Sequence, residues 1–237
     1  KTMNKIKVGK FLSTKGYGSR KHIKQMIKNE LIIEGDTLIK DFNIMVNPQE
    51  IKIEGKGVAF YDKINIVIHK PKGYVCTRVG EDSIFNLLPK IWLHRKPKVN
   101  TVGRLDKDTS GMLIITDDGQ FLHKIISPKH KISKVYKVML KEKVDIEDKQ
   151  VFEAGGLIID GEHKPCKPVL FNQIDPFNVI LTMYEGKYHQ IKKMFTACSN
   201  KVVELSRIQL GCLHIRNLKV GKWKELTEND IKLIFKG

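Results

Sequence analysis

Residues 100–115 read NTVGRLDKDTSGMLII and run from a charged loop directly into an apolar strand. Gly103 and Gly111 bracket a loop that contains Arg104, Asp106 and Asp108. Binding and catalytic groups are often carried by a loop that is anchored to a rigid element. The same composition also fits a solvated connection in which Asp and Thr side chains only satisfy turn backbone. Spacing alone leaves both interpretations open, and the rest of the chain has to decide between them.

The charge balance indicates a polyanionic partner. The chain has 237 residues with 41% hydrophobic content, which is enough for one large domain or for a small and a medium one. Lys and Arg number 43 against 26 Asp and Glu, and the formal net charge is +17. Such an excess is typical of proteins that bind nucleic acid or an acidic membrane face, although a general preference for Lys, Ile and Asn supplies part of it. We predict nucleic acid.

Other classes of protein are disfavoured by the sequence. No apolar run approaches the roughly 18 residues of a membrane helix, and no apolar signal core stands at the N-terminus. We therefore expect a cytoplasmic protein without a membrane partner. The four cysteines include no C-x-x-C pair, and His163 with Cys166 has no second pair to complete a metal site. The sequence predicts neither a disulfide framework nor a bound metal.

The N-terminal segment is basic and predicts two short helices. Residues 1–29 contain nine Lys or Arg and no acidic residue. Apolar clusters at 8–12 and 23–27 have helical spacing, Gly18 can end the first helix, and Ser19 can cap the second. Alternating strands follow up to residue 54. The basic residues left for the solvent face are Lys10, Arg20, Lys21, Lys24 and Lys28.

Residues 55–57 (Gly-Lys-Gly) are a plausible hinge to a second domain. A buried strand is predicted at 64–69 and ends in a basic turn, Lys70-Pro71-Lys72-Gly73. This turn could hold a phosphate or form an ordinary hairpin corner.

The remainder of the chain alternates strands with helices. Because strands outnumber helices and short turns join many neighbours, we predict an α+β fold with a mixed, mainly antiparallel sheet and peripheral helices. Expected strands are 112–116, 133–140, 179–183 and 201–208, with a hairpin turn at Asp160-Gly161 between 157–159 and 169–171. Expected helices are 120–126, one from Asp145 to 155–156, an amphipathic one near 188–198, and a terminal one capped by Thr227 and Asp230.

Four stretches carry a family resemblance. They are Lys70-Pro71-x-Gly73-Tyr74, then the Gly103–Leu113 loop and strand, then Lys134-x-Tyr136, and finally Tyr188–Phe195 with Val203–Arg207. In this order they resemble the RsuA-type family of ribosomal RNA pseudouridine synthases over essentially the whole chain.

The N-terminal helices and hairpin are similar to the S4 RNA-binding module. The likeness lies in Lys10-Phe11-Leu12, Ser19-Arg20 and 32–35, although Val8-Gly9 replaces the usual Leu-Asp. A basic helix pair without a ligand is the alternative. The expected domains are 1–58, S4-like, and 63–237, catalytic.

The resemblance implies that the protein isomerises uridine to pseudouridine. That reaction has no redox change and no net hydrolysis, so no cofactor is expected. Asp106 matches the family's aspartate, Tyr136 matches a tyrosine that stacks on the uracil, and Lys192 stands where an arginine is usual. Lys192 could pair with Asp106 or only contact phosphate. The predicted catalytic residues are Asp106, Tyr136 and Lys192.

Other residues take substrate roles by the same resemblance. Arg104 would fill the space of a flipped-out base, Leu205 would pack beside the base, and Asp108 is interpreted as a loop residue. The predicted substrate-binding set is Arg104, Leu205, Lys134, His189 and Gln190. The predicted RNA contacts are Lys10, Arg20, Lys21, Lys24, Lys70 and Lys72.

The stretches 73–76 and 186–190 look closest to members that act on the small subunit. We therefore expect one uridine of 16S rRNA as the target and ribosomal RNA or a pre-ribosomal small-subunit particle as the partner of a monomer. Alternatives are a uridine of 23S rRNA and a non-catalytic S4-type assembly factor.

Overall fold

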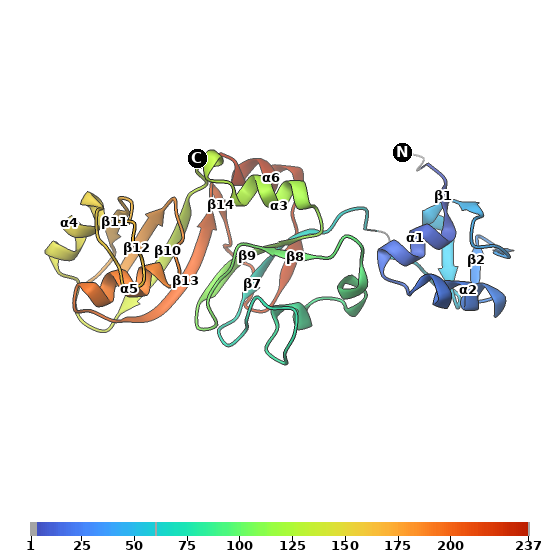
Figure 1. Cartoon of the computed structure of the whole chain (residues 1–237), viewed down its shortest axis with the longest axis horizontal. Helices are drawn as coiled ribbons and strands as arrows, with labels where there is room; N and C mark the ends of the chain where they lie inside the picture. Colours follow the sequence, from blue (N-terminus) through green and yellow to red (C-terminus); the bar gives the residue numbers. More distant parts are fainter. Residues whose placement is uncertain (1–3, 60, 237) are drawn as a thin grey trace. The chain divides into compact units, whose positions relative to one another are not determined.

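The computed structural model describes residues 4–59 and 61–236 and divides the chain into two compact units. The first unit contains the described residues up to 64 together with 85–100 and 116–118. The second contains 65–84, 101–115 and the described residues from 119 onward. Figure 1 gives the element labels used below.

Two helices of the first unit expose a basic surface. They are α1 (Val8–Lys15) and α2 (Arg20–Lys28), and they bury Phe11, Leu12 and Ile23 completely. Gly16, not Gly18, ends α1 in a left-handed conformation with φ 96°, where a Cβ atom would lie 2.3 Å from the Ile91 carbonyl oxygen. The Ser19 cap is confirmed, since its hydroxyl accepts from the His22 N–H at 3.1 Å. The five predicted basic residues all lie exposed.

Short antiparallel strands complete the first unit. The four-stranded sheet has the order β3-β2-β5-β6, and β1 (Ile6–Lys7) pairs separately with β4 (Met45–Val46). The strands of the sheet are β2 (Ile32–Glu34), β3 (Thr37–Leu38), β5 (Ile51–Ile53) and β6 (Lys56–Gly57), with a 3-10 turn η1 (Pro48–Glu50) before β5. Because β6 pairs with β5, residues 55–57 form a hairpin and not the expected hinge.

A buried ion pair ties together separate segments of the first unit. Arg95 follows η3 (Lys90–His94), and its Nη2 lies 2.7 Å from Asp117 Oδ2, with both side chains 4% exposed. Asp117 Oδ1 accepts from the Ile64 N–H at 2.8 Å, and Arg95 also donates to the carbonyl oxygen of Tyr61 at 3.0 Å. The Asp117 carboxylate is therefore a structural anchor of this unit.

The second unit is built on one large sheet with the strand order β11-β12-β10-β13-β9-β7-β15; β8 also pairs with β9, and β14 with β13. In the part of the chain that the structure describes, this sheet has nine strands. β12 runs antiparallel to β11 and β10, β13 to β10 and β14, and β15 to β7, whereas β13 and β9 run parallel. The predicted mixed, mainly antiparallel sheet is therefore confirmed. The strands are β7 (Asn65–Lys70), β8 (Asn100–Val102), β9 (Ser110–Thr116), β10 (Lys134–Leu140), β11 (Leu170–Gln173), β12 (Asn178–Met183), β13 (Val202–Leu210), β14 (Leu213–His214) and β15 (Trp223–Glu225).

Helices pack on this sheet in two groups. α3 (Gly119–Ile126) and α6 (Glu228–Ile234) lie together, with Phe121 edge-on to Phe235 at 6.3 Å (Figure 1). α4 (Ile146–Ala154) and α5 (Gln190–Ala197) lie on the β10–β13 half, where Phe152 and Phe195 rings meet at 4.7 Å. The predicted caps at Asp145 and at Thr227 with Asp230 are both present. Short 3-10 turns occur at η2 (Ile84–Leu87) and η4 (Pro128–His130).

The segment between α4 and β11 departs from the predicted hairpin. The turn itself forms, because the Glu162 N–H donates to the Ile159 carbonyl at 3.0 Å. The Cys166 N–H also donates to the Leu157 carbonyl at 2.8 Å, but residues 157–159 are not a regular strand and the next regular strand begins at Leu170. Among the described residues, no helix combines the length and apolar character needed to cross a membrane.

Candidate active site

The Asp106 loop is held from beneath by a buried lysine. Lys70, at the end of β7, is 0% exposed. Its Nζ donates to the carbonyl oxygens of Thr109 at 2.7 Å, Asp106 at 2.9 Å and Pro71 at 3.1 Å. Burial lowers the pKa of the Lys70 ammonium to about 8. The prediction of Lys70 as an RNA contact is therefore wrong: its cation fixes the backbone of the loop.

Gly111 fixes the other end of the loop. Its φ is +110°, and a Cβ atom would lie 2.2 Å from the Arg207 carbonyl oxygen, so only glycine fits here. This close approach accompanies the parallel pairing of Gly111 with Arg207, whose Nε donates to the Met112 carbonyl at 2.8 Å. The loop is thereby placed beside β13, which also carries Leu205.

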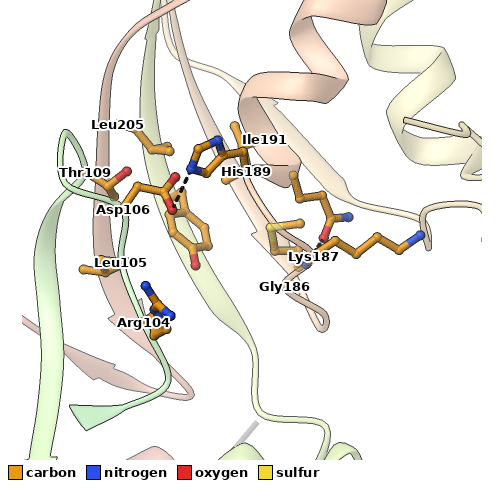
Figure 2. Close-up of a pocket in the computed structure, with 12 residues that line it drawn as sticks. Arg104, Leu105, Asp106, Thr109, Gly186, Lys187, His189, Ile191 and Leu205 are labelled. Carbon is orange, nitrogen blue, oxygen red and sulfur yellow. Dashed lines mark hydrogen bonds and ion pairs between the residues drawn. The ribbon is translucent and has the colours of Figure 1, made fainter. Parts of the chain in front are cut away.

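The Asp106 carboxylate faces two groups from α5 and its start. Lys192 Nζ lies 3.0 Å from Asp106 Oδ2, which confirms the expected ion pair. His189 Nε2 lies 3.4 Å from Asp106 Oδ1, and Figure 2 shows these two side chains pointing toward each other across the pocket. The His189 contact with the carboxylate is not signalled by the sequence, because the family resemblance implied only a general substrate role for His189.

Asp108 shares the same lysine. Its Oδ1 lies 2.5 Å from Lys192 Nζ, so one ammonium bridges two carboxylates of one loop. Burial alone would lower the pKa of Lys192, but the hydrogen bonds to Asp108 and Asp106 outweigh it and the pKa is raised. Burial is the largest single influence on the pKa of Asp108 and would raise it, but the hydrogen bond and the charge of Lys192, with smaller contributions, together lower it. Asp108 thus does more than complete the loop.

The α5 helix begins two residues after the start expected near residue 188. His189 has a left-handed conformation with φ 52°, and the first helical residue is Gln190. Tyr188 stacks on the His189 ring at 3.8 Å, and Lys193 Nζ lies 5.3 Å from the centre of the Tyr188 ring. At Tyr188 the chain is not yet helical, so Tyr188 and Lys192 do not share a helix stripe.

Gln190 stabilises the turn before α5 and is 3% exposed. Its Nε2 donates to Glu185 Oε1 at 2.6 Å, and its Oε1 accepts from the Lys187 N–H at 2.9 Å. Both ends of the amide are therefore bonded inside the protein. The structure gives Gln190 a positioning contact in place of the predicted direct hydrogen bonding to substrate.

A pocket of about 90 Å³ opens beside Asp106. Tyr136 of β10 and Leu205 of β13, which are 8% and 6% exposed, form part of its wall with Arg104 and His189 (Figure 2). The hydroxyl of Thr109, also at the wall, is buried and has no hydrogen-bond partner in the described ranges 4–59 and 61–236. A buried hydroxyl without a partner is unfavourable unless a ligand supplies one. The pocket thus unites most of the predicted catalytic and substrate residues.

The remaining predicted contacts lie elsewhere. Lys134 lines a neighbouring cavity. Lys72 is exposed and lies 2.9 Å from Glu204. On the first unit, Arg20 and Lys24 lie 5.9 and 5.7 Å from the centre of the Phe42 ring. Lys10 and Lys21 are exposed on α1 and α2.

Comparison with known proteins gives the family. The sequence profile of the RNA pseudouridylate synthase family matches residues 64–197, which is more than half of the chain. The chain belongs to the RNA pseudouridine synthase family. An uncharacterized RNA pseudouridine synthase of Bacillus subtilis is 36% identical over 236 residues, covering 97% of this chain and 98% of the relative.

Other members of the pseudouridine synthase family agree in sequence and fold. The ribosomal small subunit pseudouridine synthase A of Vibrio cholerae is 32% identical over 235 residues, covering 98% of this chain and 100% of the relative. A crystal structure of a pseudouridylate synthase matches with a TM-score of 0.68 and 31% identity, covering 97% of this chain and 99% of that one. The predicted RsuA type is confirmed, and the protein is an isomerase.

Proposed function

We propose that this pseudouridine synthase isomerises one uridine of ribosomal RNA, within the 16S rRNA of the small subunit, and that Asp106 is the reacting carboxylate. The observation that best supports this proposal is the position of the Asp106 carboxylate, at the wall of a pocket and 3.0 Å from the Lys192 ammonium. The small-subunit target is supported by the Vibrio cholerae relative, which is named for that subunit.

The reaction exchanges one bond to the ribose for another. The bond from uracil N1 to ribose C1′ breaks, a bond from C5 to C1′ forms, the C5 proton leaves, and N1 gains a proton. No electron acceptor is consumed. A charged carboxylate beside the nucleoside can attack carbon or remove a proton, and in this proposal Asp106 supplies it. The Lys192 ammonium lies 3.0 Å from that carboxylate and balances its charge.

Tyr136 and Leu205 are proposed to hold the base. Tyr136 is nearly buried on β10 and lines the pocket, where its ring can stack on uracil and its oxygen, once it has given up its own proton, can receive the C5 proton. The unpartnered Thr109 hydroxyl offers a hydrogen bond to the nucleoside. At about 90 Å³ the pocket is smaller than typical ligand sites of roughly 300 Å³ or more, so entry of a nucleoside has to displace side chains.

The target uridine has to leave its stacked position to reach this pocket. Arg104 is exposed at the pocket wall, and we assign it the space that the flipped base vacates. The basic face of α1 and α2 would bind RNA phosphates, with residues 1–58 acting as an S4-like module and 63–237 as the catalytic domain. The RNA-binding assignment rests on four exposed basic residues of these helices, Lys10, Arg20, Lys21 and Lys24.

The proposal includes a monomer that acts in the cytoplasm on ribosomal RNA or on a pre-ribosomal small-subunit particle. A non-catalytic assembly factor is the competing function. Asp106 and Tyr136 line one pocket, and Lys192 pairs with Asp106. This arrangement favours the enzyme, because RNA binding alone does not require it.

Mapping pseudouridine in rRNA from cells with and without the protein tests this function. We expect one position of 16S rRNA to lose its modification in the deletion strain and to regain it when the wild-type gene is restored. Loss of a position in 23S rRNA would replace the proposed target. An unchanged map in both rRNAs would favour the assembly factor over the enzyme.

A further inference from the structure

A second cavity lies beside the Asp106 pocket, within the same unit. It has a volume of about 360 Å³ and shares Arg104, Tyr136 and Gly186 with that pocket. Its volume falls in the range of small-ligand sites, roughly 300–1,000 Å³. The segment after α3, the start of β10 and the turn after β12 supply most of its wall. Because these three residues line both spaces, a ligand in one space can continue directly into the other.

The wall of this cavity is strongly cationic. One carboxylate, Glu185, is present, but its Oε1 already accepts from the Lys167 N–H at 2.9 Å and from Gln190 Nε2 at 2.6 Å. Glu185 forms no ion pair with the cations of this wall among the described residues, although its charge acts on Lys134 and opposes the lowering of the Lys134 pKa. The five cationic side chains are Arg104, Lys131, Lys134, Lys167 and Arg207.

Two of these cations, Lys134 and Arg207, have N–H donors without a hydrogen-bond partner among the described residues. The half-buried Lys134 ammonium makes no hydrogen bond or ion pair in the part of the chain that the structure describes. Burial, and next the nearby Arg207 guanidinium, lower the pKa of Lys134. Arg207 is 4% exposed, and its Nε is bonded to the Met112 carbonyl. Two neighbouring cations drawn out of water are unfavourable alone and are stabilised by an anion between them.

The rim of the cavity offers surface for a base. Tyr184 is 45% exposed and Ile126 is 51% exposed, and both line the cavity. Exposed aromatic rings stack on nucleic-acid bases with little regard to their identity. Cations at the floor and an aromatic ring at the rim match the two parts of a nucleotide, its phosphate and its base.

We propose that this cavity binds the nucleotide next to the target uridine in the same RNA strand, with the connecting phosphate on Lys134 and Arg207 and the base against Tyr184. The proposal rests on the proposed function, since the target uridine occupies the adjoining pocket. It makes the protein contact two successive nucleotides, both of them out of the RNA stack. The preference for a target site would then depend on how readily its neighbour unstacks.

Kinetics of two variants test the cavity on a 16S rRNA transcript without modifications. Lys134→Met removes one phosphate contact, so we expect KM to rise about tenfold and the slope of log KM against log salt to fall by about one. Tyr184→Ala removes a stacking surface, so KM should rise while the salt slope stays unchanged. The control Lys143→Met, at an exposed lysine before α4, should change neither quantity. Unchanged KM and salt slope in both cavity variants would overturn the proposal.

A binding experiment separates this proposal from the proposed function. Full-length wild-type protein is titrated with uridine 5′-monophosphate, with the trinucleotide ApUpA and with inorganic phosphate. We expect the trinucleotide to bind more tightly than the monophosphate, and Lys134→Met and Tyr184→Ala each to reduce that advantage. Trinucleotides with an abasic residue on the 5′ or the 3′ side then identify the bound neighbour.

The binding outcomes are distinct from those of rRNA mapping. Competition by inorganic phosphate without any trinucleotide advantage would reduce the cavity to a simple anion site and overturn the nucleotide assignment. A second outcome separates the two proposals: deleting the protein leaves the rRNA map unchanged, but the wild-type protein still binds the trinucleotide more tightly than the monophosphate and both variants lose this preference. That outcome would refute the proposed function and support the cavity as a nucleotide site. If Lys134→Met fails to fold, as judged by its thermal midpoint, the exposed Tyr184→Ala variant decides.

Discussion

The Lys192 ammonium lies 3.0 Å from the Asp106 carboxylate, although 86 positions separate the two residues in the chain. Two independent elements bring them together: a loop held by the buried Lys70, and a helix that starts at Gln190. The same ammonium contacts Asp108 at 2.5 Å, so its charge is shared between two carboxylates. Most family members are expected to have arginine here, and lysine retains the charge without the planar fork.

Lys192→Met should lower kcat about 10²–10³-fold, because it removes the cation that stabilises charge at the Asp106 carboxylate. Lys192→Arg should retain most activity, since a guanidinium can contact both carboxylates at once. Steady-state kinetics of pseudouridine formation measure both. Lys193→Met is the matched control on the same helix: its Nζ contacts the Asp160 carbonyl at 2.7 Å and not a carboxylate of the loop. Equal losses in the Lys192 and Lys193 variants would contradict the assignment.

Asp106→Asn should abolish pseudouridine formation while RNA binding persists. The amide has nearly the shape of the carboxylate, but it cannot act as a nucleophile or base. A single-turnover assay with excess enzyme measures the chemistry, and filter binding measures the affinity. Substantial turnover by the pure variant would remove Asp106 from the chemical step.

Asp108→Asn distinguishes a supporting carboxylate from a second catalytic one. Asp108 raises the pKa of Lys192 together with Asp106, and Asp106 remains to hold the ammonium when Asp108 is neutralised. We therefore expect only a several-fold loss of kcat/KM near neutral pH, about 1 kcal/mol or less in transition-state free energy. A loss as large as that of Asp106→Asn would instead support a mechanism with two carboxylates.

Asp117→Ala should lower the free energy of unfolding by about 3–5 kcal/mol, because it leaves the buried Arg95 guanidinium without its carboxylate. Chemical denaturation of the full-length protein measures this loss. The neighbouring Asp118 provides the control: it pairs at 2.6 Å with Lys63, whose side chain is 59% exposed. Asp118→Ala should cost about 1 kcal/mol or less. Similar losses in the two variants would show that the Arg95 pair is not specially important.

Local periodicity predicted the elements of this site well, because helices and strands depend on residues close together in sequence. The α5 helix, the β10 strand and the charged loop before β9 all stand where the pattern placed them. Helix ends were less accurate. Gly18 and Gly16 both allow a left-handed cap, and the close approach of the Ile91 carbonyl, which requires glycine at 16, is not visible in the local sequence.

Tertiary contacts explain the incorrect site predictions. Lys70 precedes Pro71 and Lys72 and therefore resembles part of an exposed basic turn. Only the folded chain brings the carbonyl oxygens of Asp106 and Thr109 over its ammonium. Likewise, Gln190 has the polarity of a substrate ligand, but Glu185 and the Lys187 N–H occupy its amide. A polar side chain has the same sequence signature whether its partner is a ligand or a distant part of the protein.

Lys70→Met should change how stability depends on pH. Burial lowers the pKa of Lys70 from 10.5 to about 8 in the folded protein. Between these values the unfolded chain holds a proton that the folded protein has released, so Lys70 makes the free energy of unfolding rise with pH across this window. The full rise is on the order of 2–3 kcal/mol, and the variant should lack it. Denaturation curves at several pH values between about 7 and 11 measure the difference between wild type and variant.

The exposed neighbour Lys72 supplies the control for this pH effect. Lys72→Met removes one lysine from the same turn without removing a buried ammonium, so its stability should follow the wild-type pH dependence. In an NMR titration of the lysine Cε resonances, one resonance should titrate with a midpoint near pH 8. That resonance should be absent from the Lys70→Met spectrum. Parallel stability curves for wild type and Lys70→Met would mean that the pKa of Lys70 is the same in the folded and the unfolded chain. The carbonyl oxygens of the Asp106 loop would then fully offset the effect of burial on the ammonium.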